Sequence, residues 1–416
     1  MNPGADLGQI EDLPLFEGMQ SADWGVDFDV SSEELFARKD RGILRDPGGS
    51  VLAYTNEDLR VLAKMPDLAN LPFDQLTEEL TSEAGDGPRG YQQLMRNHVF
   101  TLQPPTHGPV RQVFSGHLAK GKVQVQRGVA EDVVESVLDD VPAGEVIDFE
   151  NDFARVVSAR FWSRFLEISI DESDQAAQLA GRILPALNVR RSAEEALAAN
   201  RAAAGYMEVL SRGIDRVVAG GGNESFNEMA FALEQVEDPD RPASVGLAFA
   251  SMLFDAFHTA TALTTNVVYT LLQQPAIVHE IIASPDVIGT AVSEAMRLNS
   301  PIIATVRCAF TDIEHRGVTI RRGTPVKMLW IFGNRDPEVF ASPAEFRLDR
   351  ERRRQVTFGG GFHICPGRNI ASVLVEAMVS VLFRDDVEID VSGDARWLPA
   401  SKSHQLESLP VTIHRR

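Results

Sequence analysis

The sequence predicts a mainly α-helical protein with a minor β component, organised as a single large domain with small sheets over residues 1–416. Ala-rich and apolar periodicity favours helices through most of residues 110–272. After residue 301 the pattern changes to strand-like segments, in which short apolar runs are broken by Gly and Arg. No internal repeat, low-complexity tract or linker divides the chain, and we therefore expect one domain.

The chain is irregular before the helical stretch. Residues 1–50 are loop-rich, and residues 66–97 contain many Pro and Gly, which indicates a long binding loop or lid with short helices. The run AGGGN at 219–223 is a helix stop. It lacks the Lys and Ser/Thr of a phosphate-binding loop, so we assign it no function.

The C-terminal part of the chain alternates between helical and strand patterns. In order, these are helices at 275–283 and 286–298, strands at 317–320 and 325–331 with a hairpin turn at Gly323 and Thr324, a turn-rich segment at 334–354, an amphipathic helix at 369–383 and a strand at 409–413.

Composition limits the partners and the compartment. The net charge of -20 argues against nucleic acid and anionic membranes as partners, and is typical of a soluble protein. Two cysteines are too few for a disulfide scaffold, and the N-terminus lacks a signal-peptide pattern, so we expect a cytoplasmic protein. The apolar run at 245–272 carries Asp255 and His258 in its middle, which predicts a core helix and not a membrane span.

The segment FGGGFHICPG at 358–367 is the most informative part of the sequence. Its glycines allow a tight turn and the close approach of a flat ligand. A helix that begins just after Cys365 favours the thiolate form of this cysteine, and His363 and Arg368 make the surroundings electropositive. Thiolate ligation to iron needs such a sheltered site.

Other interpretations of Cys365 are a small buried residue beside a glycine turn, a zinc ligand, or part of a Cys-Pro haem-sensing motif. The zinc site is disfavoured because Cys308 is too distant in the sequence to supply the usual paired ligands.

This segment resembles the cysteine-ligand loop of the cytochromes P450. The family pattern F-x-x-G-x-H-x-C-x-G falls on Phe358, Gly361, His363, Cys365 and Gly367. The resemblance implies the cytochrome P450 fold, heme b as the cofactor and Cys365 as the ligand of its iron, with Phe358 and Gly367 against the cofactor.

Further motifs extend this resemblance over most of the chain. Glu294 and Arg297 resemble the family's E-x-x-R pair, whose members share a helix face. In the family this pair is buried against an arginine of the turn-rich meander, which corresponds to Arg350. The run NRDP at 334–337, with the aromatic residues that follow it, resembles the meander itself.

Four basic residues match the family's ligands of the haem propionates. The segment PPTHGPVR at 104–111 resembles P-P-x-H-x-x-x-R and supplies His107 and Arg111, while Arg307 and His363 match two further positions. Charge-assisted bonds to carboxylates explain these residue types. The chain departs from the family at Gln103, where an Asp is common.

The family's A-G-x-[DE]-T pattern on the long central helix falls on residues 255–259. Thr259 keeps the alcohol, but His258 replaces the acid and Asp255 replaces a small residue. Spacings of three and four place Asp255, His258 and Thr259 on one helix face. We hypothesise that Asp255 orients His258, which replaces the carboxylate in the proton relay for dioxygen activation. Alternatively, His258 contacts substrate or pairs with a buried polar neighbour.

By resemblance, a mainly apolar pocket predicts a small hydrophobic organic substrate, with Asp255 and His258 available to anchor a hydroxyl or amine. The residues expected to line this pocket are Phe254, Phe257, Ile302, Ile303 and Val306. Electrons are expected from a separate ferredoxin and ferredoxin reductase, for which Arg352, Arg353, Arg354 and Arg368 are a candidate docking patch.

The resulting expectation is a monooxygenase that inserts one oxygen atom from O2 into its substrate. Because His258 stands at the usual acid position, a peroxygenase or a non-hydroxylating oxidation catalyst is the alternative. A non-catalytic haem sensor would leave Glu294, Arg297 and Arg350 without a role.

Overall fold

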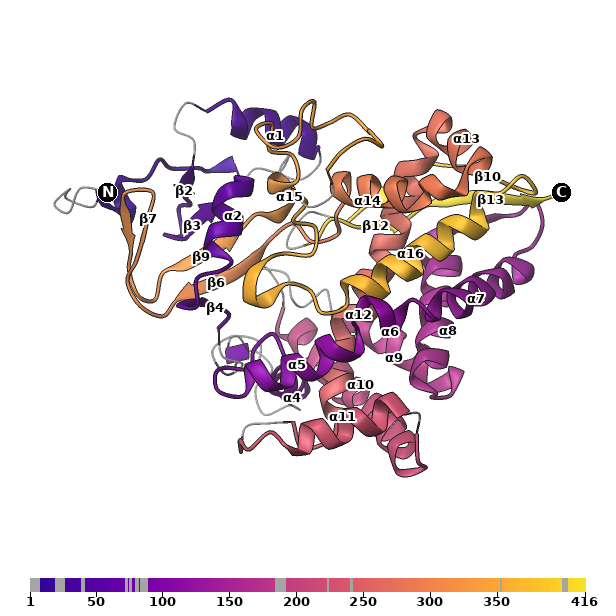
Figure 1. The fold of residues 1–416 in the computed structure, drawn as a ribbon, viewed down its shortest axis with the longest axis horizontal. Helices are drawn as coiled ribbons and strands as arrows, with labels where there is room; N and C mark the ends of the chain where they lie inside the picture. Colours follow the sequence, from indigo (N-terminus) through magenta and orange to yellow (C-terminus); the bar gives the residue numbers. More distant parts are fainter. Residues whose placement is uncertain are drawn as a thin grey trace. The chain divides into compact units, whose positions relative to one another are not determined.

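A computed structural model describes residues 8–18, 27–38, 42–71, 89–183, 192–222, 224–239, 242–351, 354–398 and 403–416, with a few isolated positions between 72 and 88. The chain forms two compact units, each assembled from separate stretches of sequence (Figure 1). The helical unit comprises 72–292, 366–396 and 406–416, and the mixed unit comprises 1–71, 293–365 and 397–405. The single-domain expectation stays a prediction.

The helical unit contains most of the helices and a three-stranded sheet of order β10-β13-β5. Its helices are α4 (Gly90–Asn97), α5 (His107–His117), α6 (Lys120–Val123), α7 (Gln126–Asp140), a π-helix (Phe149–Ala154), α8 (Arg155–Leu166), α9 (Ile170–Ile183), α10 (Ala193–Ala219), α11 (Glu224–Glu234), α12 (Val245–Leu272), α13 (Pro275–Ala283) and α16 (Arg368–Leu382). Its strands are β5 (Val146–Asp148), β10 (Val387–Val391), β12 (Leu406–Ser408) and β13 (Pro410–Arg415), and β11 (Arg396–Trp397) begins in it.

The long helix α12 forms the centre of the helical unit. Ser244 caps it by accepting a hydrogen bond from the Leu247 amide. Gly246 lets α12 approach α10 closely, because a Cβ at this position would lie 2.3 Å from the Ser211 carbonyl oxygen. By length and composition α12 resembles a membrane span, yet most of it is buried by protein, as expected for a core helix.

Glu150, in the π-helix, is a half-buried acid held against α12. The Thr265 hydroxyl donates a hydrogen bond to its carboxylate. Burial raises the pKa of Glu150 to about 7, with a smaller contribution from the charge of Asp148 and opposed by the Thr265 bond. The pKa of this carboxyl is higher in the folded protein than in the unfolded chain. Its ionisation therefore lowers the stability of the fold as the pH rises from the pKa of the unfolded chain through the pKa of the folded protein.

Glu150→Gln is therefore expected to stabilise the protein above pH 7 by about 2–3 kcal/mol and to change little near pH 4.5. Urea unfolding at the two pH values measures this difference. Glu145→Gln, at an exposed position before β5, is the control and should give the same small change at both. An equal effect of Glu150→Gln at both pH values would contradict the prediction.

The mixed unit is built on a five-stranded sheet of order β2-β3-β9-β6-β4 and a three-stranded sheet of order β1-β8-β7. Its strands are β1 (Gly8–Gln9), β2 (Ile43–Arg45), β3 (Val51–Ala53), β4 (Leu68–Ala69), β6 (Thr305–Ala309), β7 (Ile313–His315), β8 (Val318–Ile320) and β9 (Pro325–Met328). Its helices are α1 (Phe28–Phe36), α2 (Asn56–Leu62), α15 (Trp330–Gly333) and the second half of α14 (Ile288–Leu298).

Two expectations around Gly323 need correction. The predicted strand at 325–331 ends at Met328, and α15 follows. The turn at Gly323 exists, with φ +87°, but it joins strands of different sheets, since β8 pairs with β7 whereas β9 pairs with β3 and β6. The predicted hairpin is wrong because turn residues show where the chain reverses, not which strand it then pairs with.

The other predicted segments agree with the structure to within a few residues. Helix α13 covers 275–283, and α14 begins at Ile288 after a 3-10 turn at Pro285–Val287. Helix α16 covers 368–382, and the last strand runs over Pro410–Arg415. Helix α10 ends at Ala219, where the AGGGN run predicted a stop.

Candidate active site

The cysteine segment of the mixed unit is a tight loop that leads directly into α16. The Cys365 amide donates a hydrogen bond to the Phe358 carbonyl oxygen, 2.9 Å away, and closes the loop. Gly361 has φ +62°, and a Cβ there would lie 1.7 Å from the Ala63 carbonyl oxygen. Only glycine fits this position, because both the backbone conformation and the close approach exclude a side chain. The Cys365 side chain is half-buried.

Arg307, on β6, is a buried cation attached to this loop. It is 2% exposed, and its guanidinium donates to the Ala63 carbonyl oxygen at 3.1 Å and to the Gly360 carbonyl oxygen at 3.3 Å. The Nε atom of Arg307 is buried, and no described residue accepts a hydrogen bond from this atom. No carboxylate of the described residues lies within ion-pair distance of the guanidinium. Burial lowers the pKa of Arg307 to about 10. Such a guanidinium favours the binding of an anionic group beside it.

His363 lies in the same loop, and Asn70 holds its ring. The Asn70 side-chain amide lies 3.1 Å from Nδ1 of His363. Since an amide NH2 only donates, Nδ1 accepts, and the ring proton of a neutral His363 is on Nε2. Asn70 was missed by the sequence analysis because it is 293 residues away along the chain and belongs to no motif.

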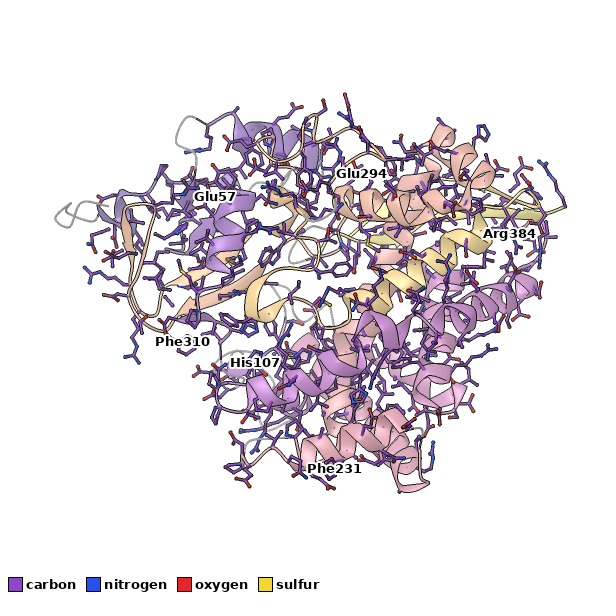
Figure 2. The ribbon with its side chains drawn as sticks, in the orientation of Figure 1. Glu57, His107, Phe231, Glu294, Phe310 and Arg384 are labelled. Carbon is purple, nitrogen blue, oxygen red and sulfur yellow. The ribbon has the colours of Figure 1, made fainter. Side chains whose placement is uncertain are left out.

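The structure brings Glu294, Arg297 and Arg350 together in the mixed unit (Figure 2 labels Glu294). Arg297 forms a two-bond pair with Glu294, at 2.9 and 2.8 Å, and Arg350 Nε donates to the same carboxylate at 2.7 Å. Glu294 is 2% exposed and Arg297 fully buried. The remaining donors of Arg297 reach the carbonyl oxygens of Asn334 and Pro343, so the cluster ties α14 to the meander.

In the helical unit, His107 and Arg111 lie one turn apart at the start of α5 (Figure 2 labels His107). Burial lowers the pKa of His107, and the positive charge of Arg111 adds to the effect. At neutral pH, His107 is therefore a neutral imidazole beside a fixed cation. The pair therefore carries one positive charge and a hydrogen-bonding ring at the start of α5.

The central helix carries a polar cluster at 255–259. The Thr259 hydroxyl donates to the Asp255 backbone oxygen at 2.6 Å. The Asp255 carboxylate lies 3.4 Å from Nε2 of His98, a partner that the sequence analysis missed because His98 follows α4 and is far away in sequence. Burial lowers the pKa of His258 to about 4, although the charge of Asp255 acts in the opposite direction. The orientation of His258 by Asp255 stays a prediction.

Comparison with known proteins identifies the family. The family model of cytochrome P450 matches residues 252–389. The chain is 33% identical over 294 residues to the 20-oxo-5-O-mycaminosyltylactone 23-monooxygenase of Streptomyces fradiae, covering 69% of this chain and 67% of that protein. The chain belongs to the cytochrome P450 family. It is also 27% identical to the biotin biosynthesis cytochrome P450 of Bacillus subtilis, with 78% and 82% of the two chains covered.

Structural comparison confirms the cytochrome P450 fold. The crystal structure of CalO2 superposes with a TM-score of 0.83 at 20% identity, covering 97% of this chain and all of that one. Named relatives are monooxygenases and hydroxylases, so this P450 is a monooxygenase and an oxidoreductase.

The P450 family implies a haem cofactor, and the described residues fit one. The loop of Cys365 offers a sulfur ligand, and glycines allow a flat group to approach the backbone. The buried charge of Arg307 suits a carboxylate substituent of that group.

The five predicted lining residues of the P450 pocket differ in accessibility. Ile302 and Val306 keep some accessible surface in the mixed unit. In the helical unit, Phe254 and Phe257 are each 3% exposed and pack edge-on against Tyr206. Ile303 is fully buried in the core of the mixed unit. The contact of these residues with substrate stays a prediction.

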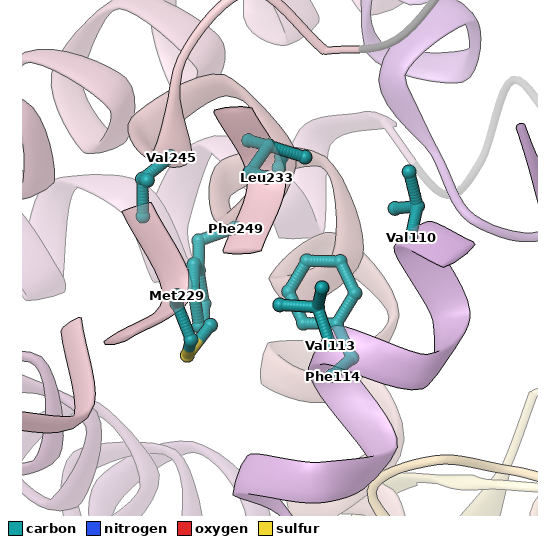
Figure 3. A pocket seen from close by; sticks show the side chains of 8 residues that line it. Val110, Val113, Phe114, Met229, Leu233, Val245 and Phe249 are labelled. Carbon is teal, nitrogen blue, oxygen red and sulfur yellow. The ribbon is translucent and has the colours of Figure 1, made fainter. Parts of the chain in front are cut away.

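A separate small pocket lies among α5, α11 and the first turns of α12 (Figure 3). Only apolar side chains line it: Val110, Val113, Phe114, Met229, Leu233, Val245, Ala248 and Phe249. It carries no group that transfers protons or binds a charge, so it is part of the packing of the helical unit and does not belong to the polar cluster at 255–259.

Proposed function

We propose that this P450 holds heme b through the thiolate of Cys365 and inserts one oxygen atom from O2 into a hydrophobic small organic substrate. The observation that carries the proposal is Arg307, a buried guanidinium bonded to the loop of Cys365 and without a carboxylate partner among the described residues. A buried charge of this kind is costly unless an anion compensates it, and a haem propionate is the anion that the family supplies.

Each proposed residue has a defined task. Cys365 binds the metal, Phe358 and Gly367 border the cofactor, and Arg307 and His363 hold propionate carboxylates. In the helical unit, His107 and Arg111 perform the same task. When bound, the haem supplies the chemistry of dioxygen activation, promoted by electron donation from the thiolate.

The residues of α12 are proposed to handle protons. The hydroxyl of Thr259, held by the Asp255 backbone oxygen, positions a proton next to the reaction site. His258 is neutral at pH 7, and a neutral imidazole accepts a hydrogen bond at one ring nitrogen and donates one from the other, which is the role proposed for it in the relay.

Separate redox proteins are proposed as the electron source, a ferredoxin and its reductase, in the cytoplasm. In the candidate docking patch, Arg352 and Arg353 lie outside the described residues. Arg354 has a side chain 57% exposed, which suits contact with an acidic partner.

The test of this proposal is the absorption spectrum of the reduced protein under carbon monoxide. Thiolate ligation predicts a far-red-shifted Soret band. Its absence from haem-loaded protein would reject the proposed ligand. Product formation with O2, ferredoxin and reductase, compared with peroxide alone, then distinguishes a monooxygenase from the second candidate, a peroxygenase or non-hydroxylating catalyst, which His258 at the acid position favours.

His258→Ala is expected to lower substrate turnover with O2 by about 10²-fold, the lower range for the loss of a proton-transfer group, and to divert reducing equivalents to peroxide. The measurement is product formed per NAD(P)H consumed. His258→Gln, which keeps a polar side chain but does not titrate, should share the defect. Unchanged turnover and coupling in His258→Ala would exclude the relay.

A further inference from the structure

Asp255 on α12 carries a negative charge that no Lys or Arg of the described chain compensates. Its side chain is 59% exposed, although the flanking Phe254 and Phe257 are 3% exposed. Among the described residues, no Lys or Arg lies within ion-pair distance, and its basic partner is His98, whose Nε2 lies 3.4 Å from Oδ2. Burial acts to raise the pKa of Asp255, but the proximity of His98 and His258 brings it below its ordinary value. The carboxylate is ionised at neutral pH.

His98 turns one ring nitrogen toward the backbone and the other toward Asp255. His98 is 3% exposed, and its Nδ1 accepts a hydrogen bond from the Phe100 amide at 3.0 Å. The proton of the ring therefore lies on Nε2, the nitrogen that faces Asp255. His98 thus directs an N–H dipole toward Asp255.

Two further titratable groups near Asp255, His258 and Tyr206, are neutral at pH 7. His258 has a pKa of about 4, and burial together with the charge of Asp255 raises the pKa of Tyr206 well above its ordinary value. Neither His258 nor Tyr206 therefore supplies a positive charge that would compensate the Asp255 carboxylate at pH 7.

Tyr206 provides the second indication of a ligand. It is fully buried, and its hydroxyl has no hydrogen-bond partner among the described residues. Nearly all buried polar groups in proteins are hydrogen-bonded, so an unpaired hydroxyl close to an uncompensated carboxylate is suited to a polar ligand group. The hydroxyl oxygen can turn its negative end toward a cationic group, while the carboxylate supplies the charge.

We propose that Asp255, with His98 and Tyr206, recognises a cationic group, so that the substrate of this oxygenase carries an ammonium attached to an apolar body. This inference rests on the proposed function and names its substrate class. The cation would be bound beside Thr259, because residues at i and i+4 share a helix face. An ammonium neutralises the lone carboxylate, whereas a neutral substrate leaves it unpaired.

The test compares two probes of the same shape, benzyltrimethylammonium and the neutral neopentylbenzene, by isothermal titration calorimetry on the haem-loaded protein. A quaternary nitrogen has no lone pair, so binding cannot arise from ligation of the metal. We expect the cation to bind at least about tenfold more tightly than its isostere, which corresponds to about 1.4 kcal/mol. This preference should weaken as salt concentration rises.

Asp255→Asn should abolish the preference and leave the affinity for neopentylbenzene within about a factor of two, less than 0.5 kcal/mol. Asp255→Glu keeps the charge and should keep the preference, which separates loss of charge from damage to the fold. Asp140→Asn, at a carboxylate on α7 that is 65% exposed, makes the same change in net charge and should bind both probes as the unmodified protein does.

Equal affinity of the unmodified protein for the two probes, or an undiminished preference in Asp255→Asn, would overturn the inference. The carbon monoxide spectrum of the same samples tests the proposed function separately. A far-red-shifted band without a cation preference rejects the recognition site alone. A cation preference without that band rejects thiolate ligation and leaves Asp255 as a cation site.

Discussion

Glu294→Ala is expected to destabilise the protein by about 3–5 kcal/mol, the usual cost of removing one partner from a buried ion pair. The carboxylate binds both Arg297, which is fully buried, and Arg350, whose side chain is 7% exposed. Its removal leaves two guanidinium groups without their counter-ion. Since folded proteins are stable by only about 5–15 kcal/mol, a loss of this size lowers the yield of folded protein substantially.

The effect is measured by urea unfolding followed by far-UV circular dichroism. Asp349→Ala is the matched control: it removes the carboxylate from an exposed pair with Arg347, 2.8 Å apart, in the same meander. An exposed pair contributes about 0–1 kcal/mol, so the control should unfold close to the unmodified protein. Equal midpoints for both variants would show that the buried cluster does not stabilise the fold.

The long helices of this P450 were predictable because they have an amphipathic or apolar pattern between recognisable ends, whereas α1, at Phe28–Phe36, lies in the stretch that the sequence predicted as loop-rich. Segment 325–331 was not, because every residue from Trp330 to Gly333 is buried. An apolar run that is buried on all sides has no periodicity to separate a strand from a helix. The pairing of β9 with β3 was equally inaccessible, since the two strands come from opposite ends of the chain.

Local sequence patterns gave the residues of the candidate site, but not their partners. Glu294 and Arg297 are three residues apart, so their pairing follows from helix geometry. Asn70 and His98 contact site residues that are distant in sequence, and only the tertiary structure shows them. The sequence also did not predict that Asp255 is exposed while its neighbours Phe254 and Phe257 are buried. Protein surrounds most of this central helix, so the sequence pattern does not show which of its residues stay accessible.

Cys365→Ser is expected to eliminate the far-red-shifted Soret band of the reduced, carbon monoxide-treated protein and to reduce turnover with O2 to background. Serine is nearly isosteric and leaves the backbone bond from residue 365 to Phe358 in place, so the loop should keep its shape. An alcohol does not ionise at neutral pH, and the variant therefore loses the negatively charged ligand that donates electron density. Haem can still associate, because Arg307 and His363 are unchanged.

The second cysteine supplies the control for this prediction. Cys308 lies on β6 beside Arg307 and is half-buried, and burial raises the pKa of its thiol, so it favours the neutral form. Cys308→Ser should keep both the far-red-shifted band and turnover, because a neutral thiol of this kind ligates poorly. If Cys308→Ser loses the band and Cys365→Ser retains it, the ligand has been assigned to the wrong cysteine. If both variants keep it, the metal is not held by a thiolate of this chain.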